Sequence, residues 1–174
     1  MSSRIKNLSA YDPTEIPDGT EFRIGIVVSE YHQNITFALR DAAIKTLLEN
    51  GVAQENIPIE YVPGAFELPL GANVLFTGME CDAVIAIGCV IKGDTEHDQY
   101  INTAVTNELM QMNTEFIAPF IFGLLTTNTL AQAQDRAGGK LGNKGTECAI
   151  AALKMCALIE RNMGDDFDQT SSLN

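Results

Sequence analysis

The chain has 174 residues, of which 45% are hydrophobic and 20% charged, a composition typical of one compact domain that excludes disorder over most of its length. Eleven Lys and Arg against 23 Asp and Glu give a formal net charge of −12, which repels nucleic-acid backbones and anionic membrane surfaces. The longest apolar run, residues 83–91, is too short to span a bilayer.

The first half of the chain predicts a polar arm followed by alternating strands and helices. Residues 1–20 are polar and contain Pro13 and Pro17, so we expect an N-terminal arm. RIGIVV (23–28) is apolar throughout, as expected of a central strand covered on both faces. A helix from Asn34 or Thr36 to Asn50 follows. The next strand, IPIEYV (57–62), contains a proline, which favours a sheet edge.

The same alternation continues through the second half. A helix over residues 66–77 precedes an apolar strand over 83–91, and the loop KGDTEHDQ separates this strand from a helix over about 100–114. A strand over 120–125, a short helix over 130–137 and a long one over 144–162 follow. The pattern predicts an α/β fold, a flavodoxin-like three-layer αβα sandwich with a four-stranded parallel sheet. We expect the domain over 21–162 and a polar, acidic tail over 163–174.

The four cysteines show no metal-binding pattern. They contain no C-x-x-C pair and no His at zinc-ligand spacing. We therefore expect buried, reduced thiols and no metal site. The first residues have no apolar stretch followed by a small-residue cleavage site, so a cytoplasmic location is the expectation.

In open α/β sheets, ligands bind beyond the carboxyl ends of the strands, which makes the segments after each strand the candidate site. Gly93, Asp94 and Thr95 precede a helix, where backbone N–H groups and the Thr95 hydroxyl can hold an oxyanion. Either Asp94 or Thr95 can equally be an ordinary helix N-cap. Arg136 can bind a phosphate through its two-pronged guanidinium group or compensate a helix dipole.

Other side chains in these segments suit chemistry or binding, and each has an ordinary alternative. His97, one of two histidines, titrates near neutral pH and fits proton transfer, although an isolated histidine is often a surface residue. Glu67 can bind sugar hydroxyls or favour a helix dipole. Tyr31 can stack on a heterocycle or pack within its loop. Lys92 and Lys144 can contact substrate or solvent.

Resemblance to a known family is carried by three segments: VPGAFELPL (62–70), AVIAIGCVIKGDTEHDQY (83–100) and FGLLTTNTLAQAQDRAGGKLGNKGTECA (122–149). Their order and spacing resemble the 6,7-dimethyl-8-ribityllumazine synthase family over residues 22–162. The resemblance implies condensation of 5-amino-6-(D-ribitylamino)uracil with 3,4-dihydroxy-2-butanone 4-phosphate to 6,7-dimethyl-8-ribityllumazine, releasing phosphate and water. This is the penultimate step of riboflavin biosynthesis, and it implies neither cofactor nor metal.

The resemblance also implies residue roles. The ring of Tyr31 would stack on the pyrimidine, His97 would move protons, and Arg136 would join the loop after the third strand in binding phosphate. Phe122 and Lys144 would reach in from a neighbouring subunit. The implied catalytic residues are His97 and Arg136, and the implied substrate-binding residues are Tyr31, Ala65, Phe66, Glu67, Val90, Ile91, Gly93, Asp94, Thr95, Phe122 and Lys144. We expect Tyr31, Arg136 and His97 to share one pocket at a subunit boundary.

The same resemblance implies a homo-oligomer built of pentamers, and association with riboflavin synthase is possible. The short segment GGKLGNKG (138–145) favours an icosahedral shell. One departure concerns the residue after Tyr31, where the family usually has Asn and this chain has His32.

Two other functions stay open. An FMN-binding electron carrier would need a Ser/Thr/Gly-rich loop after the first strand, but SEYHQN (29–34) has no glycine. The replacement at His32 keeps open a shell-forming scaffold that has lost catalysis, whereas Thr95, His97, Arg136 and Lys144 argue against it.

Overall fold

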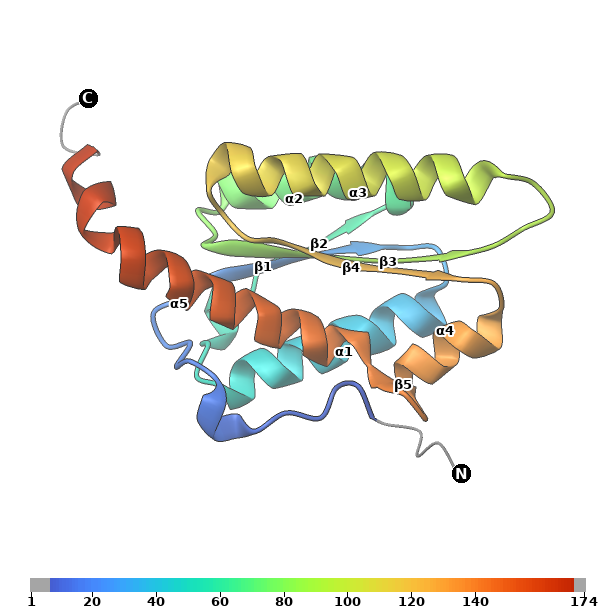
Figure 1. Cartoon of the computed structure of the whole chain (residues 1–174), viewed down its shortest axis with the longest axis horizontal. Helices are drawn as coiled ribbons and strands as arrows, with labels where there is room; N and C mark the ends of the chain where they lie inside the picture. Colours follow the sequence, from blue (N-terminus) through green and yellow to red (C-terminus); the bar gives the residue numbers. More distant parts are fainter. Residues whose placement is uncertain (1–6, 171–174) are drawn as a thin grey trace.

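The computed structural model describes residues 7–170, with side chains to residue 163. One sheet of four parallel strands has the order β2–β1–β3–β4 (Figure 1). This confirms the expected fold and the edge position of the strand expected over 57–62, which in the structure begins at Ile59, directly after Pro58. The sheet strands are β1 (Ile24–Ser29), β2 (Ile59–Val62), β3 (Ala83–Ile91) and β4 (Phe120–Thr127), and the helices are α1 (Gln33–Glu49), α2 (Leu68–Gly78), α3 (His97–Phe116), α4 (Leu130–Arg136) and α5 (Lys144–Thr170).

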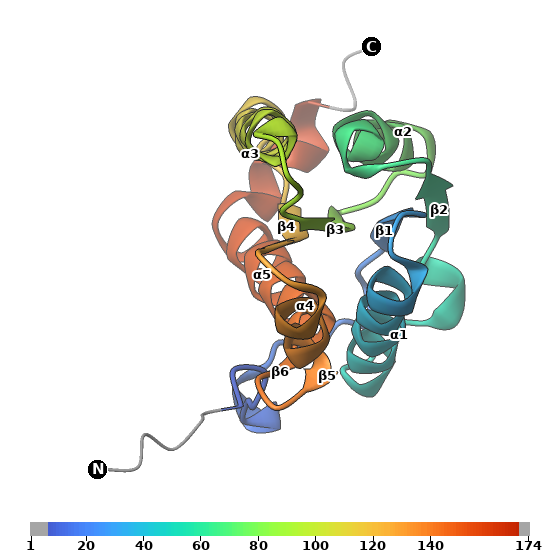
Figure 2. The same cartoon turned by 90° about the vertical axis from the view of Figure 1, so that its right-hand side faces the viewer.

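The helices form a layer on each face of the sheet. Viewed along the strands, α2 and α3 cover one face and α1, α4 and α5 cover the other (Figure 2). Parallel strands need such crossover helices, and the helices in turn bury both faces of the sheet. The three-layer sandwich places the carboxyl ends of all four strands at one edge.

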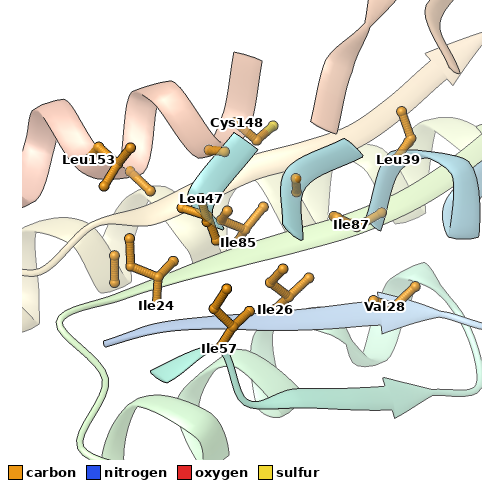
Figure 3. Close-up of a cluster of buried hydrophobic side chains, with 14 of the residues drawn as sticks. Ile24, Ile26, Val28, Leu39, Leu47, Ile57, Ile85, Ile87, Cys148 and Leu153 are labelled. Atoms are coloured by element: carbon orange, nitrogen blue, oxygen red, sulfur yellow. The ribbon is translucent and has the colours of Figure 1, made fainter. Parts of the chain in front are cut away.

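The sequence of β1 is a continuous apolar run because both faces of this strand are buried in the core. All six of its residues are buried. Ile24, Ile26 and Val28 point toward α1 and α5, where they meet Leu47 among others (Figure 3). Val27 belongs to the separate core under α2 and α3. Each such side chain contributes roughly 1.5–3 kcal/mol when buried, so the sheet is rigid where it carries the site.

Several boundaries differ from expectation. Helix α3 begins at His97 rather than near residue 100, and α5 runs to Thr170 rather than ending near 162. A glycine weakens a helix by about 1 kcal/mol without interrupting it, which lets α5 pass through Gly164. A two-stranded hairpin, β5 (Ala137–Gly139) and β6 (Gly142–Asn143), was not expected.

Residues 7–20 of the expected arm lie against the domain. The Leu8 N–H donates to Leu141 O (3.0 Å), and the Gly19 N–H donates to Asn50 O (2.8 Å). The Asn143 N–H donates to Ser9 Oγ (3.0 Å). A short 3-10 turn, Pro13–Glu15, is capped by the side chain of the preceding aspartate. The beginning of the arm (1–6) and the end of the tail (171–174) lie outside the described residues.

The cysteine interpretation is confirmed. All four thiols are free and buried. Burial raises the pKa of the Cys148 thiol to about 12 and that of Cys89 to about 11, because a thiolate is poorly solvated inside the protein. These thiols are therefore protonated at neutral pH and are not nucleophiles.

Among the helices of the described chain, none is both long and apolar enough to cross a membrane.

The raised thiol pKa values predict a loss of stability at alkaline pH. Above pH 9, the ordinary value for a thiol, cysteines of the unfolded chain ionise while Cys148 stays neutral in the fold. The unfolded state is then favoured, by up to ~1.4 kcal/mol per pH unit for each thiol, until the folded pKa is passed. The free energy of unfolding, measured with urea at several pH values between 8 and 11, should fall less steeply with pH in Cys148→Ala than in the wild type, by about 1 kcal/mol per pH unit. Equal slopes would contradict the expectation.

Candidate active site

A pocket of about 420 Å³ opens at the carboxyl ends of β2, β1 and β3. The segments that follow β1 and β2, together with the end of β3 and the start of α3, supply its walls. The lining residues are Tyr31, His32, Gly64, Ala65, Phe66, Glu67, Cys89, Val90, Ile91, Gly93, Thr95, His97, Asp98 and Ile101. A larger hollow of about 500 Å³, lined among others by Glu21, Phe76 and Glu160, contains no candidate residue.

Most of the predicted site residues meet in this one pocket. They come from three separate stretches of chain, and the sheet order brings these stretches together. Asp94 is exposed in the loop between two lining residues but does not itself line the pocket. The predicted residues that line it are Tyr31, Ala65, Phe66, Glu67, Val90, Ile91, Gly93, Thr95 and His97.

Tyr31 and Glu67 lie side by side because Gly64 leaves room for both. A Cβ added at Gly64 would lie 3.1 Å from Glu67 Oε2 and 3.4 Å from Tyr31 Cδ2. The Tyr31 ring is 69% exposed and the Phe66 ring 63% exposed, so two aromatic surfaces are free to contact a ligand. The arrangement combines flat apolar surfaces with a carboxylate, which suits a heterocycle bearing a hydroxylated chain.

The opposite wall combines a helix N-terminus with an imidazole. His97 is the first residue of α3, and its N–H donates to Thr95 Oγ1 (3.4 Å). The N-cap of α3 is Glu96, which makes no side-chain cap hydrogen bond, so neither Asp94 nor Thr95 is the N-cap. A Cβ added at Gly93 would meet no atom within 4 Å, so the backbone there is accessible. Helix N-termini favour anions, and this wall is the part of the pocket best suited to a phosphate.

Arg136, Phe122 and Lys144 do not line the pocket of their own chain. Within one chain, Arg136 therefore does not share the pocket of Tyr31 and His97. All three residues come from the same part of the chain: Phe122 lies on β4, and Arg136 and Lys144 follow β4 in the sequence. Because β4 is the sheet edge opposite β2, these residues belong to a different side of the domain.

Arg136 and Lys144 are held together by a carboxylate that the sequence analysis did not consider. Glu147 Oε1 lies 2.6 Å from Arg136 Nη2, and Glu147 Oε2 lies 3.1 Å from Lys144 Nζ. Arg136 Nη1 also donates to Leu141 O (3.1 Å). Two cations and one carboxylate leave a formal charge of +1, so the cluster can still attract an anion. The spacing of Glu147, three residues after Lys144 in a helix, was the available signal.

His32 has a left-handed backbone conformation, in which asparagine, the residue that the family resemblance leads us to expect, would also fit. Its φ and ψ are 57° and 49°, in the left-handed region, at the start of α1. Asparagine and histidine are among the non-glycine residues that tolerate this region, whereas β-branched residues are strongly disfavoured. The substitution of His for Asn therefore keeps the backbone of this wall.

The stability of variants at position 32 should depend on how well the new residue tolerates a left-handed backbone. We expect His32→Asn to match or exceed the wild type in stability, and His32→Val to lose about 1–2 kcal/mol. Urea midpoints measure both effects. A His32→Val protein as stable as the wild type would refute the assignment of positive φ.

Asp98 and Ile101 were also missed. Asp98 lies before the expected start of the helix, near residue 100, and Ile101 lies just inside it. Both line the pocket from the first turns of that helix. Among the side chains that the structure describes, no three His, Cys, Asp or Glu residues gather as metal ligands.

The fold and the pocket define an α/β protein that binds a small molecule at the carboxyl edge of a parallel sheet, with an imidazole beside an anion-binding helix terminus. The family model for 6,7-dimethyl-8-ribityllumazine synthase matches residues 21–160. The chain belongs to this family of transferases.

Curated relatives agree with the family model. A 6,7-dimethyl-8-ribityllumazine synthase of Porphyromonas gingivalis is 52% identical over 91% of this chain and 98% of the relative. The proteins of that name from Parabacteroides distasonis and Bacteroides fragilis are 50% and 56% identical, over 89% and 79% of this chain and 97% and 96% of their own lengths.

Proposed function

We propose that this protein condenses 5-amino-6-(D-ribitylamino)uracil with 3,4-dihydroxy-2-butanone 4-phosphate, giving 6,7-dimethyl-8-ribityllumazine, phosphate and water. Membership of the family supports the reaction. The main structural support for the proposed site is that Tyr31, Glu67 and His97 line the same pocket. In this proposal the pyrimidine stacks on Tyr31 and its ribityl chain reaches Glu67 and the backbone of residues 65–66.

The residue types fit the chemistry. The pyrimidine substrate supplies its own amine for the imine, so no lysine nucleophile is needed, and the protein has to orient two reactants and move protons. His97 lies at the helix start where the phosphate of the second substrate would be bound by the backbone near Gly93 and by Thr95. An imidazole at this place can pass protons during imine formation, phosphate elimination and ring closure.

The pocket is completed by a second copy of the chain. Arg136, Phe122 and Lys144 lie on and after β4, away from their own pocket, and they include the strongest phosphate ligand among the candidates. A contact in which the β4 side of one copy meets the pocket of the next is heterologous, and such contacts form a ring when the rotation between copies closes. We propose a pentameric ring of this kind, cytoplasmic, with an icosahedral shell of pentamers as its further assembly and riboflavin synthase as a possible associate.

The decisive experiment is incubation of the purified protein with both substrates, followed by the fluorescence of the lumazine product. We expect turnover by the wild type and a loss of about 100-fold in kcat for His97→Ala, within the range of general acid–base catalysis. Circular dichroism should be unchanged because His97 is exposed. Light scattering on the same sample measures the assembly. A correctly folded wild type without turnover would favour the scaffold function instead.

A further inference from the structure

A second, polar cavity lies next to the substrate pocket. Its volume is about 250 Å³, and of its eight lining residues only Val90 is apolar. Lys92, from the end of β3, and Thr127, from the end of β4, form one side of it. Asp98 and Asn102 form the other side from α3. We call this cavity the polar chamber.

Asp98 is the side chain that joins the chamber to the substrate pocket. It lines both cavities, whereas Asn102 lines the chamber alone. Val90, the other residue common to both, offers no polar side-chain atom. A group in the chamber can therefore act on the substrate pocket through the Asp98 carboxylate.

The chamber contains two acceptors without donors. Asp98 Oδ1 and Asn102 Oδ1 are shielded from solvent and accept no hydrogen bond from the described residues. Asp98 also takes part in no ion pair within the described chain. The two residues are four positions apart on one helix and so lie on the same face. Shielded acceptors of this kind are normally satisfied by ordered water.

The chamber is large and polar enough to hold that water. Its volume is far above the ~10–15 Å³ that one water requires, and polar partners surround it. Gln132 Oε1 accepts from the Asn128 N–H (2.9 Å), which leaves the NH2 group of Gln132 as a donor. Neither oxygen borders open space in this structure, so the two side chains would turn slightly toward the chamber for one water to donate a hydrogen to each.

We propose that Asp98 is a positioning residue of the condensation, which holds ordered water of the polar chamber against the substrate pocket. The inference rests on the proposed function. When the substrate amine attacks the ketone, the C–N bond forms and leaves a cationic nitrogen and an anionic oxygen. On the way to the imine the nitrogen loses both of its protons, and the former carbonyl oxygen gains two before its C–O bond breaks and it leaves as water. Chamber water accepts each proton from the nitrogen and returns one to the oxygen, and the Asp98 charge stabilises the transient positive charge.

Four variants test this role. Asp98→Asn keeps the shape and removes the charge, so we expect kcat to fall about 10–100-fold while KM for each substrate stays within about two-fold. Asp98→Glu restores the charge and should retain more activity than Asp98→Asn. Asn102→Leu removes the second acceptor without touching the substrate pocket, and kcat should fall with KM unchanged. Glu115→Gln, an exposed carboxylate near the end of the same helix, is the control for lost charge and should match the wild type.

The outcomes separate this inference from the proposed function. A wild type that makes no lumazine argues against the proposed function. An active wild type with an unchanged kcat in Asp98→Asn overturns the role of Asp98. A raised KM with normal kcat also overturns it, since Asp98 would then be a substrate contact. A high-resolution crystal structure gives a readout independent of activity: ordered water bonded to Asp98 Oδ1 and Asn102 Oδ1 is expected, and a chamber without it refutes the proposal.

Discussion

Replacement of Gly145 with alanine should destabilise the protein by about 3 kcal/mol or more. A Cβ at this position would overlap the backbone carbonyl oxygen of Leu39 and lie 2.7 Å from its carbonyl carbon. The contact is between α1 and α5, and neither backbone can move without disturbing the core between the helices. Overpacking usually costs about 1–3 kcal/mol, and a clash with main-chain atoms belongs at the upper end.

The helices are also fixed to each other by hydrogen bonds at this crossing. The Gly145 N–H donates to Asn143 Oδ1 (2.8 Å), and Asn143 Nδ2 donates to Ala38 O (3.1 Å). A shift of α5 that relieves the clash would break this connection. It would also displace Lys144, which begins the helix. The loss predicted for Gly145→Ala is a large part of the ~5–15 kcal/mol that stabilises a typical domain.

Gly78→Ala is the matched control. Gly78 is also helical, it lacks a positive φ, and a Cβ there would meet no atom within 4 Å. Alanine should therefore stabilise the protein slightly, by up to ~1 kcal/mol, because it restricts the unfolded chain. Urea unfolding of both variants measures the difference. Similar midpoints for the two variants would show that α1 and α5 do not approach each other as closely as the structure places them.

The sequence was sufficient for the fold because its strands are unambiguous. Residues 83–91 were expected as a strand and form β3 with those same bounds. Pro58 correctly indicated the edge strand, since it cannot donate to a sheet ladder. Helix ends were harder to predict. The polar, charged segment before α3 carries no hydrophobic period, so the helix was expected to start after His97 and Asp98, the residues that begin it.

The site was predictable only in part, because position along the chain does not show which side of the domain a residue faces. The residues after β1, β2 and β3 were correctly expected to converge, since parallel strands end at one edge. Arg136 was grouped with them from its chemical type and from the family resemblance, neither of which shows where it lies in the fold. Its contact with Glu147 arises from a hairpin at residues 137–143 that the sequence did not predict. The left-handed backbone of His32 likewise becomes visible only in three dimensions.

Subunit mixing should restore activity to a pair of inactive variants. In the proposed assembly, one copy supplies His97 and its neighbour supplies Arg136. His97→Ala alone and Arg136→Ala alone leave every pocket defective, and each should lose about 100-fold or more in turnover. In a random 1:1 co-assembly, about a quarter of the pockets combine an intact His97 with an intact Arg136. The mixture should therefore recover about a quarter of wild-type activity.

The control pair is His97→Ala with Tyr31→Ala. Both residues line the pocket of their own chain, so co-assembly creates no pocket in which both are intact. Each copy in this mixture carries one defect on the pocket side, and activity should stay at the mean of the two variants. Co-expression of differently tagged chains, followed by two-step purification and the lumazine fluorescence assay, measures both mixtures. If the first pair recovers no more activity than the control pair, the phosphate ligand does not come from a neighbouring copy, because only a pocket built from two chains can regain function by exchange of subunits.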